Sequence, residues 1–274
     1  MAQREMMADM HMRAAQENPF KHWLGQNRIT LGFWNALANP MLAEIVAEHP
    51  GFEWMLFDTE HAPNDIQSLI AQLQAIRFSG KPAVGRPVQN HPAEIKRLLD
   101  IGFRNLLIPN VQTVEEAKQA VAATRYPPDG TRGVSAYHRN NGYGRVTDYF
   151  QFINQSIGVV VQIESAQAVE RMEQIGGVEG VDALFVGPGD LAADLGYLGQ
   201  IRHPEVQAVL QEIGRRARNA GIALGITSHG IDDVERYVNW GYRFFTMSSD
   251  VVLFRQAVAQ LSDLATEFGA RAKD

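Results

Sequence analysis

The fold of this 274-residue chain is decided by the segment Gly158-Val159-Val160-Val161-Gln162-Ile163-Glu164. Its valines are apolar on both faces, as expected for a parallel strand covered by helices on one side and by a barrel core on the other. Side chains two apart in a strand share a face, so Val160, Gln162 and Glu164 should point the same way. The segment therefore predicts a buried strand with polar groups at its carboxyl end.

Seven further short apolar runs flank this segment, and helical patterns separate them. The runs lie at residues 29–34, 54–58, 82–86, 105–109, 183–186, 223–227 and 244–248. The helical patterns cover residues 40–48, 65–76, 92–101, 114–124, 166–175, 204–220, 231–240 and 251–268. Gly102, Gly221 and Gly241 directly follow three of these patterns, where a left-handed residue ends a helix. Strict alternation predicts an α/β fold, a closed (β/α)8 TIM barrel rather than an open sheet.

The predicted domain organisation is simple, because α/β barrels commonly use about 250 residues as one domain. We assign residues 28–274 to a single barrel domain and residues 1–27 to an N-terminal extension. The connection 125–156 is too long for a turn and contains a proline pair and a Gly-Tyr-Gly step. We interpret it as a partly ordered lid or a subunit contact, with a plain surface insert as the alternative.

Composition and charge exclude several classes of function. With 45% hydrophobic and 20% charged residues, the chain can bury a large core. A formal net charge of −6 provides no basic field for nucleic acid or an anionic membrane. The absence of cysteine excludes disulfides and thiolate chemistry. No apolar run has the length of a membrane span or builds a secretory signal, so we expect a cytoplasmic protein.

Acidic side chains end two neighbouring strands of the predicted barrel, where catalytic residues of such barrels lie. Glu164 ends the fifth strand and Asp190 follows the sixth, so the two should reach one point in space. Two carboxylates that face one spot repel each other unless a cation or proton lies between them. Oxygen ligands alone favour Mg²⁺ or Mn²⁺. The alternative is that Glu164 is a helix N-terminal carboxylate and Asp190 an N-cap.

Two more ionisable groups are predicted at the same rim. Arg86 ends a buried strand and needs an anionic partner, which could be a structural salt bridge or an oxyanion formed during a reaction. His61 lies three residues after Asp58, close enough for that carboxylate to bind one imidazole nitrogen and leave the other for proton transfer. These residue types indicate general acid–base chemistry on a bound anion.

The remaining candidates concern substrate binding. Gly187-Pro188-Gly189 supplies small residues and backbone N–H groups that suit a carboxylate or phosphate. Trp34 and Ile226, near the ends of the first and seventh strands, could form walls of the pocket or pack in the core. A Schiff-base mechanism needs a lysine at the rim. We disfavour it because the lysines fall in helices, near the termini or at the opposite end of a strand: Lys21, Lys81, Lys96, Lys118 and Lys273.

Ordered motifs over residues 29–252 resemble the HpcH/HpaI aldolase family. They are Leu31-Gly32-Phe33-Trp34, Asp58-Thr59-Glu60-His61-Ala62-Pro63-Asn64-Asp65, Gly85-Arg86-Pro87, Leu98-Leu99-Asp100-Ile101-Gly102, Arg125-Tyr126-Pro127-Pro128, Arg132-Gly133, Val161-Gln162-Ile163-Glu164-Ser165 and Gly187-Pro188-Gly189-Asp190-Leu191. The resemblance implies a class II pyruvate aldolase, of the 4-hydroxy-2-oxoheptanedioate or 2-dehydro-3-deoxyglucarate aldolase kind. Such enzymes are usually hexamers, so we expect a homo-oligomer, a trimer of dimers with the C-terminal helix in the contacts.

The resemblance also implies roles for individual residues. The metal ligands of the family fall on Glu164 and Asp190, with Mg²⁺ or Mn²⁺ as the cation and Co²⁺ as a further candidate. Its enolate-stabilising arginine falls on Arg86, and its acid–base histidine falls on His61 with Asp58 behind it. The groups expected to bind substrate are Gln162, Gly187, Pro188, the Gly189 backbone, Trp34, Arg132 and Ile226. Gly189 departs from the alanine or serine of many relatives.

The sequence therefore predicts a metal-dependent aldolase that cleaves a 4-hydroxy-2-oxoacid reversibly to pyruvate, or a related 2-oxoacid, and an aldehyde. The implied partners are these small molecules. Two alternatives stay open: an acyl-CoA lyase or decarboxylase that uses the same metal enolate, and a non-catalytic barrel that serves as a binding protein. The Met-rich N-terminal extension and the segment 135–145 differ from the family's pattern, so the aldehyde is left open.

Overall fold

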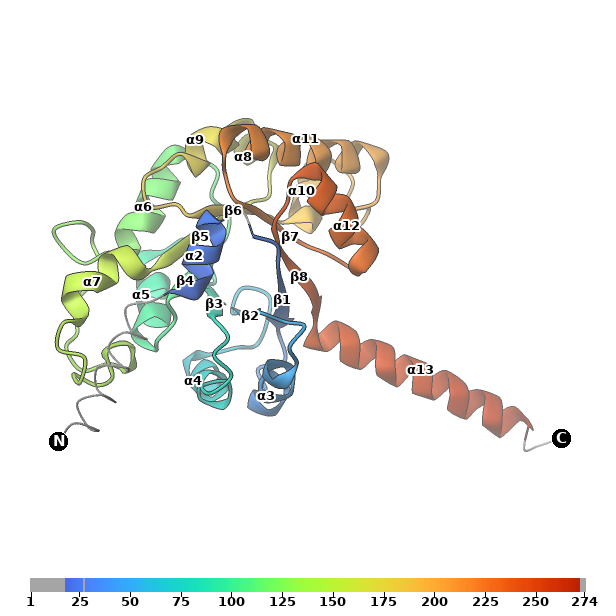
Figure 1. The fold of residues 1–274 in the computed structure, drawn as a ribbon. Coiled ribbons are helices and arrows are strands. Elements are labelled where there is room, and N and C mark those ends of the chain that lie inside the picture. Colours follow the sequence, from blue (N-terminus) through green and yellow to red (C-terminus); the bar gives the residue numbers. More distant parts are fainter. Residues whose placement is uncertain (1–17, 27, 272–274) are drawn as a thin grey trace.

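The computed structural model describes residues 18–26 and 28–271. Eight parallel strands form a closed barrel, in which each strand pairs with the next and β8 pairs with β1 (Figure 1). The strands are β1 (Thr30–Asn35), β2 (Trp54–Asp58), β3 (Ala83–Arg86), β4 (Asn105–Ile108), β5 (Gly158–Ile163), β6 (Ala183–Val186), β7 (Leu224–Thr227) and β8 (Phe244–Ser249). The predicted single-domain (β/α)8 barrel is confirmed, and the strand bounds differ from the predicted ones by single residues.

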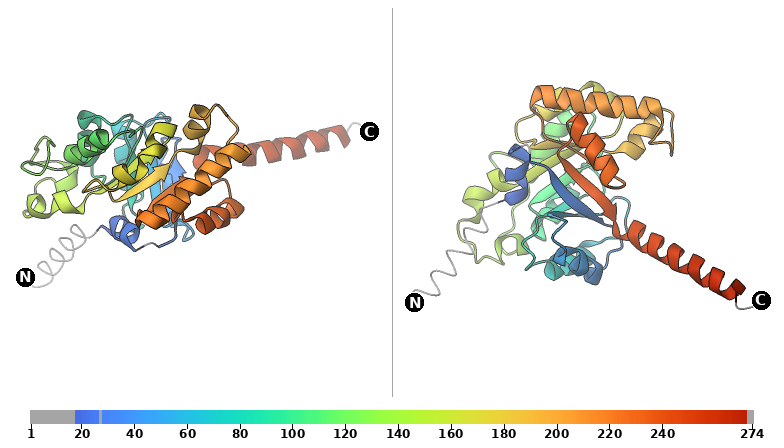
Figure 2. Two further views of the ribbon diagram at one scale, coloured as in Figure 1. Left: turned by 90° about the horizontal axis from the view of Figure 1, so that it is seen from above. Right: turned by 45° about the vertical axis from the view of Figure 1, so that its right-hand side comes forward.

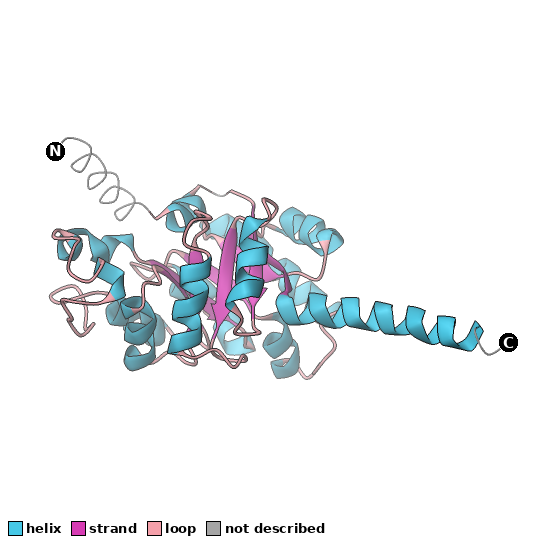
Figure 3. Cartoon of the chain, turned by 90° about the horizontal axis from the view of Figure 1, so that it is seen from below, coloured by secondary structure: helices cyan, strands magenta, loops and turns pink. Residues whose placement is uncertain are grey.

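Helices surround the barrel (Figure 3). Those that follow strands are α3 (Pro40–Glu48), α4 (Ile66–Ala75), α5 (Pro92–Asp100), α6 (Val114–Thr124), α8 (Ala166–Glu170), α9 (Met172–Gly176), α10 (Pro188–Asp194), α11 (Pro204–Ala220), α12 (Ile231–Trp240) and α13 (Asp250–Arg271). Local chemistry sets their ends: Thr113 forms a capping box with Glu116 at the start of α6, and Gly221 adopts φ 69° at the end of α11. The helix predicted over 166–175 is divided into α8 and α9 at Arg171.

The inside of the barrel is filled by large side chains from alternate strand positions. Members of this inner cluster include Trp54, Leu56, Val84, Leu107, Val160, Phe185 and Phe244. Phe20 and Leu24 of α2 (Pro19–Gly25) join the same cluster, so α2 closes the barrel at the amino ends of the strands. A domain boundary at residue 28 would cut through this packing, and we place the start of the domain at α2 instead. Residues 1–17 of the predicted extension lie outside the described residues.

The long connection between α6 and β5 is not a lid over the rim. It contains the short helix η1 (Arg139–Asn141) and α7 (Tyr149–Ser156). Arg139 donates to the carbonyl oxygens of Ile101, at 2.8 Å, and Leu73. Both of these residues lie near the carboxyl ends of helices that run away from the rim, so the insert packs against the opposite end of the barrel. The prediction of a lid is therefore wrong, and a subunit contact remains a prediction.

The C-terminal helix α13 projects away from the barrel (Figures 1 and 2). Many of its apolar side chains are exposed: Val251, Leu253, Phe254, Val258, Leu261, Leu264 and Phe268. The first residue of the helix, Asp250, is instead buried, and its carboxylate accepts hydrogen bonds from the backbone N–H groups of Ala36 and Leu37, both at 2.9 Å. The start of α13 is thus fixed to the loop that follows β1. Within the described residues, no helix has the length and apolarity to cross a membrane.

Candidate active site

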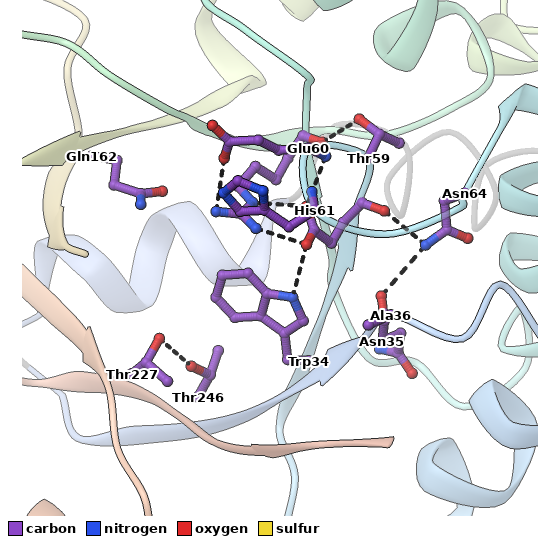
Figure 4. Close-up of polar contacts among 12 residues, drawn as sticks. Trp34, Asn35, Ala36, Thr59, Glu60, His61, Asn64, Gln162, Thr227 and Thr246 are labelled. Atoms are coloured by element: carbon purple, nitrogen blue, oxygen red, sulfur yellow. Dashed lines mark hydrogen bonds and ion pairs between the residues drawn. The ribbon is translucent and has the colours of Figure 1, made fainter. Parts of the chain in front are cut away.

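Asp58 and Arg86 form a buried ion pair at the carboxyl ends of β2 and β3. The two residues are register partners, so both side chains point into the barrel mouth. Arg86 Nε and Nη2 donate to the two carboxylate oxygens of Asp58 at 2.8 and 2.6 Å, and Trp34 Nε1 donates to the same carboxylate at 3.3 Å (Figure 4). Burial by itself raises the pKa of Asp58, but the hydrogen bonds and charge of Arg86 outweigh it and hold this pKa below the usual 3.8. Asp58 is therefore charged at neutral pH.

Arg86 is held from two further sides. Its Nη1 lies 2.8 Å from a carboxylate oxygen of Glu60, and its guanidinium lies 4.5 Å from the centre of the Trp34 ring. The protein thus supplies the salt bridge that was one alternative for Arg86. The other alternative, an oxyanion formed during the reaction, also remains open to its chemistry, because the guanidinium has five N–H groups and these contacts do not use all of them. Fixed in this way, Arg86 can present a positive charge with little reorganisation.

The loop after β2 is fixed by hydrogen bonds, and it leaves His61 exposed at the rim. Asp58 accepts from the backbone N–H of Glu60 at 2.9 Å and of His61 at 3.4 Å, and Asn64 Nδ2 donates to the Asp58 carbonyl at 2.7 Å (Figure 4). We expected Asp58 to bind the His61 imidazole. Instead it binds the His61 backbone, because Arg86 and Trp34 occupy its carboxylate.

Carboxylates also gather around Glu164, at the carboxyl end of β5. Gln162, which faces into the barrel from β5, donates through its side-chain amide to Glu164, and the backbone N–H of Asn110 donates to Glu164 at 2.6 Å. Burial raises the pKa of Glu164 above 4.5, and the nearby charges of Asp190 and Glu60 raise it further. Glu164 thus lies in a concentration of negative charge that a cation would relieve.

Neither Glu164 nor Asp190 is the N-cap residue of a helix. Ser165, not Glu164, caps α8, and Gly187 is the N-cap of α10. Asp190 lies inside the first turn of α10 with its side chain exposed. Among residues 18–26 and 28–271, no group of three or more histidine, aspartate or glutamate side chains could hold a metal ion by itself. Any cation would therefore complete its shell with other oxygens.

Gly187 is buried where the chain passes closest to Gln162 and Glu164. A Cβ added at Gly187 would lie 2.7 Å from Gln162 Nε2 and 2.7 Å from Glu164 Oε2. A Cβ at Gly189 would meet nothing within 4 Å. A side chain at position 187 would therefore displace the polar ends of Gln162 and Glu164, whereas position 189 has room for a Cβ.

Two predicted substrate-binding residues lie elsewhere. Ile226 is fully buried in the outer core between strands and helices, so it points away from the barrel mouth. Arg132 is also buried: it binds Asp100 at 2.9 Å and lies 4.4 Å over the ring of Tyr126. Asp100 ends α5, which runs away from the rim, so Arg132 belongs to the opposite end of the barrel. Both residues are removed from the candidate site.

Sequence reasoning missed four residues that contribute to this mouth. Glu60 lies between the neighbours that were singled out, and Asn110 binds Glu164 only through its backbone. Thr227 and Thr246 are joined by a hydrogen bond of 3.1 Å between their hydroxyls and lie across from Trp34 in Figure 4. Phe244 faces into the barrel, and side chains two apart in a strand share a face, so the sequence could have indicated that Thr246 faces inward too. Thr227 is the residue of β7 that pairs with Thr246.

Comparison with known proteins identifies the family. The HpcH/HpaI aldolase/citrate lyase family profile matches residues 30–257. The 5-keto-4-deoxy-D-glucarate aldolase of Citrobacter koseri is 50% identical over 246 residues, which are 90% of this chain and 95% of the relative. The chain belongs to the HpcH/HpaI aldolase/citrate lyase family. The family resemblance and the prediction of a carbon–carbon lyase of the aldolase kind are thereby confirmed.

Further similar proteins support this family assignment. The 5-keto-4-deoxy-D-glucarate aldolase of Shigella sonnei is 49% identical over 90% of this chain and 96% of the relative. A crystal structure of an HpcH/HpaI aldolase/citrate lyase family protein from Burkholderia cenocepacia superposes with a TM-score of 0.86 at 38% identity, covering 91% of this chain and all of that one. The named relatives are aldolases, which favours the aldolase over an acyl-CoA lyase or a binding protein.

Proposed function

We propose that this enzyme is a divalent-metal-dependent pyruvate aldolase that acts on a 4-hydroxy-2-oxoacid of the sugar-acid kind, such as the 5-keto-4-deoxy-D-glucarate for which its relatives are named. The observation that carries the proposal is the convergence of two unlike groups at one mouth. Arg86, fixed on Asp58, supplies a positive charge, and Glu164, at the end of β5, supplies a negative one, with Asp190 and Glu60 near enough to raise its pKa. An aldolase needs both a charge for an enolate oxygen and a place to bind a 2-oxoacid.

The residues at Glu164 suit a hard divalent cation. Glu164 and Asp190 would hold it, and their carboxylate oxygens are the ligands that Mg²⁺ and Mn²⁺ prefer, with Co²⁺ as a further candidate. The buried Gln162 Oε1 has no hydrogen-bond partner within the described part of the chain, which leaves an oxygen free beside these carboxylates. When bound, the cation would supply Lewis acidity next to the 2-oxo group.

The protein's own groups would divide the remaining work. Arg86 would stabilise the negative charge on the enolate oxygen through the N–H groups that Asp58 and Glu60 leave free. Gln162 and the backbone N–H of Gly189 would orient the substrate carboxylate. Gly187 and Pro188 are not available for this, because the Gly187 N–H donates to the Ile163 carbonyl at 3.1 Å and proline has no N–H. The Trp34 ring would form the wall behind Arg86. His61, exposed at the rim, would take the proton of the 4-hydroxyl group through a water molecule during cleavage and return it during synthesis.

Proton exchange tests this function without knowledge of the aldehyde. With Mn²⁺ present, the enzyme should exchange the C3 protons of pyruvate for deuterium in D2O, as followed by ¹H NMR, because enolate formation needs no second substrate. Chelation with EDTA should abolish exchange, and Mn²⁺, Mg²⁺ or Co²⁺ should restore it. A binding protein would show no exchange under any of these conditions. Exchange at an unchanged rate after complete chelation would contradict the metal proposal.

We also propose that the enzyme is a homo-oligomer, a hexamer arranged as a trimer of dimers, in which α13 packs against another copy. Its many exposed apolar side chains support this, because monomers seldom expose so much apolar surface on one helix. Replacing both Phe254 and Leu261 with aspartate should therefore lower the molar mass in solution, as measured by light scattering after size-exclusion chromatography. Gln256→Asp, on the same helix, is the matched control and should leave the mass unchanged. Wild-type mass in the double variant would count against this role of α13.

A further inference from the structure

A half-open cavity lies beside the candidate active site. It has a volume of about 260 Å³ and is bordered by the loops that follow β2, β3 and β4 together with α6. These loops are all at the carboxyl ends of strands, on the same rim as Asp58, Arg86 and Glu164. Its polar lining residues are Glu60, Gln89, Asn90, Asn110, Glu116 and Gln119, and its apolar ones are Val88 and Pro109.

Two lining residues also contact proposed catalytic residues, which places the cavity next to them. Glu60 forms an ion pair with Arg86 at 2.8 Å. Asn110 donates its backbone N–H to Glu164 at 2.6 Å and adopts φ 53°, a left-handed conformation that is uncommon for a residue other than glycine. A molecule held at Glu164 therefore has this cavity as its neighbour.

The walls of the cavity are fixed, while several polar groups on them are free to meet a ligand. Asn90 Nδ2 donates to the Glu116 carbonyl at 3.1 Å, which ties the loop after β3 to α6. The Glu116 carboxylate is occupied by the backbone N–H groups of Gln112 and Thr113. Gln89 and Gln119, in contrast, have exposed side chains.

The polar part of the lining suits hydroxyl groups, because amides both donate and accept hydrogen bonds, as a hydroxyl requires. Amide side chains reach the cavity from two sides, from the loop after β3 and from α6. The volume is below the roughly 300–1,000 Å³ of sites for drug-sized ligands, so it fits a fragment of a few carbons. We propose that this cavity binds the hydroxyl-bearing carbons of the aldehyde fragment and thereby sets acceptor specificity. This inference rests on the proposed aldolase function and adds the chemical class of the second substrate.

The test compares two three-carbon aldehydes in the synthetic direction, with pyruvate and Mn²⁺. Glyceraldehyde carries two hydroxyls, and propionaldehyde carries none. Gln119→Leu should raise KM for glyceraldehyde about five-fold, the value of one hydrogen bond, and leave KM for propionaldehyde unchanged or lower. Gln89→Leu should do the same. Gln74→Leu is the matched control, because Gln74 is exposed near the carboxyl end of α4, far from the rim, and it should change neither KM.

Pyruvate C3 exchange in D2O separates the two proposals. It should stay at the wild-type rate in all three variants, because enolate formation does not use the cavity. Wild-type enzyme without exchange would overturn the aldolase function and the cavity's role with it. Normal exchange combined with equal KM shifts for both aldehydes, or with none, would overturn the cavity's role alone. So would a wild-type enzyme whose KM values for glyceraldehyde and propionaldehyde are equal.

Discussion

Replacing Arg86 with alanine should lower kcat/KM for aldol cleavage by about 100- to 1,000-fold, the usual loss when a fixed oxyanion donor is removed. The variant should also be less stable, because it leaves the Asp58 carboxylate buried without its counter-charge. Removing one member of a buried pair costs about 3–5 kcal/mol of unfolding free energy. We expect the low end, because Trp34 and the backbone N–H groups of Glu60 and His61 still bind Asp58. Steady-state kinetics and urea unfolding measure the two effects.

A second substitution separates loss of chemistry from loss of fold. Asp58→Asn, added to Arg86→Ala, removes the unpaired charge and should recover most of the lost unfolding free energy. Activity should stay low, because the positive charge for the enolate oxygen is still missing. A folded Arg86→Ala enzyme with wild-type kcat/KM would contradict the role of Arg86, and so would recovery of activity in the double variant.

Gly187→Ala should lower kcat/KM about 100-fold even though it adds a single methyl group. The new Cβ would lie 2.7 Å from both Gln162 Nε2 and Glu164 Oε2, so these side chains must move away. A displacement of about 1 Å in a catalytic group can cost 100-fold in rate. The backbone of Gly187, with φ −88°, accepts an alanine without strain, so the effect arises from crowding. Kinetics together with Mn²⁺ titration would show whether metal affinity falls in parallel.

Gly189→Ala is the matched control, two residues further along the same turn. Its Cβ would meet nothing within 4 Å, and alanine favours a helix more than glycine does. Activity near that of the wild type is expected, with an unchanged or slightly higher melting temperature. An equal loss of activity in the two variants would show that the close approach at Gly187 is not what matters.

Much of this architecture could be predicted because it depends on local patterns. Each strand is a short β-rich run whose limits are set by flanking glycine, proline or helix-capping residues, and so the strand bounds were predicted to within single residues. The polar ends of those strands, such as Asp58 and Arg86, could be located because all parallel strands of a barrel present their carboxyl ends on one rim.

It was harder to predict which alternate side chains of a short strand face the barrel interior. β7 contains four residues, and sequence alone does not say whether Ile226 or Thr227 faces inward. The answer comes from pairing with β8, where Thr246 points into the mouth and its register partner is Thr227. A single-residue error in phase exchanges the pocket face for the helix face.

Contacts between distant segments could not be read from the sequence. Asp58 could have bound the ring of His61, three residues away in the sequence. Instead, Arg86, 28 residues away, binds both carboxylate oxygens in a bidentate geometry. Arg132 finds its partner, Asp100, only after the insert folds against the far end of the barrel. Likewise, the sequence of residues 19–25 does not indicate that Phe20 packs into the end of the barrel, because that contact depends on the folded barrel.

The carboxylate of Asp250 joins the C-terminal helix to the segment immediately after Trp34, through the N–H groups of Ala36 and Leu37. Trp34 in turn lies against the guanidinium of Arg86. If the helix is held by a neighbouring subunit, separating the subunits frees one end of this chain of contacts and loosens the wall of the reaction chamber. The turnover number per subunit should then depend on enzyme concentration, falling on dilution below the dissociation constant of the assembly.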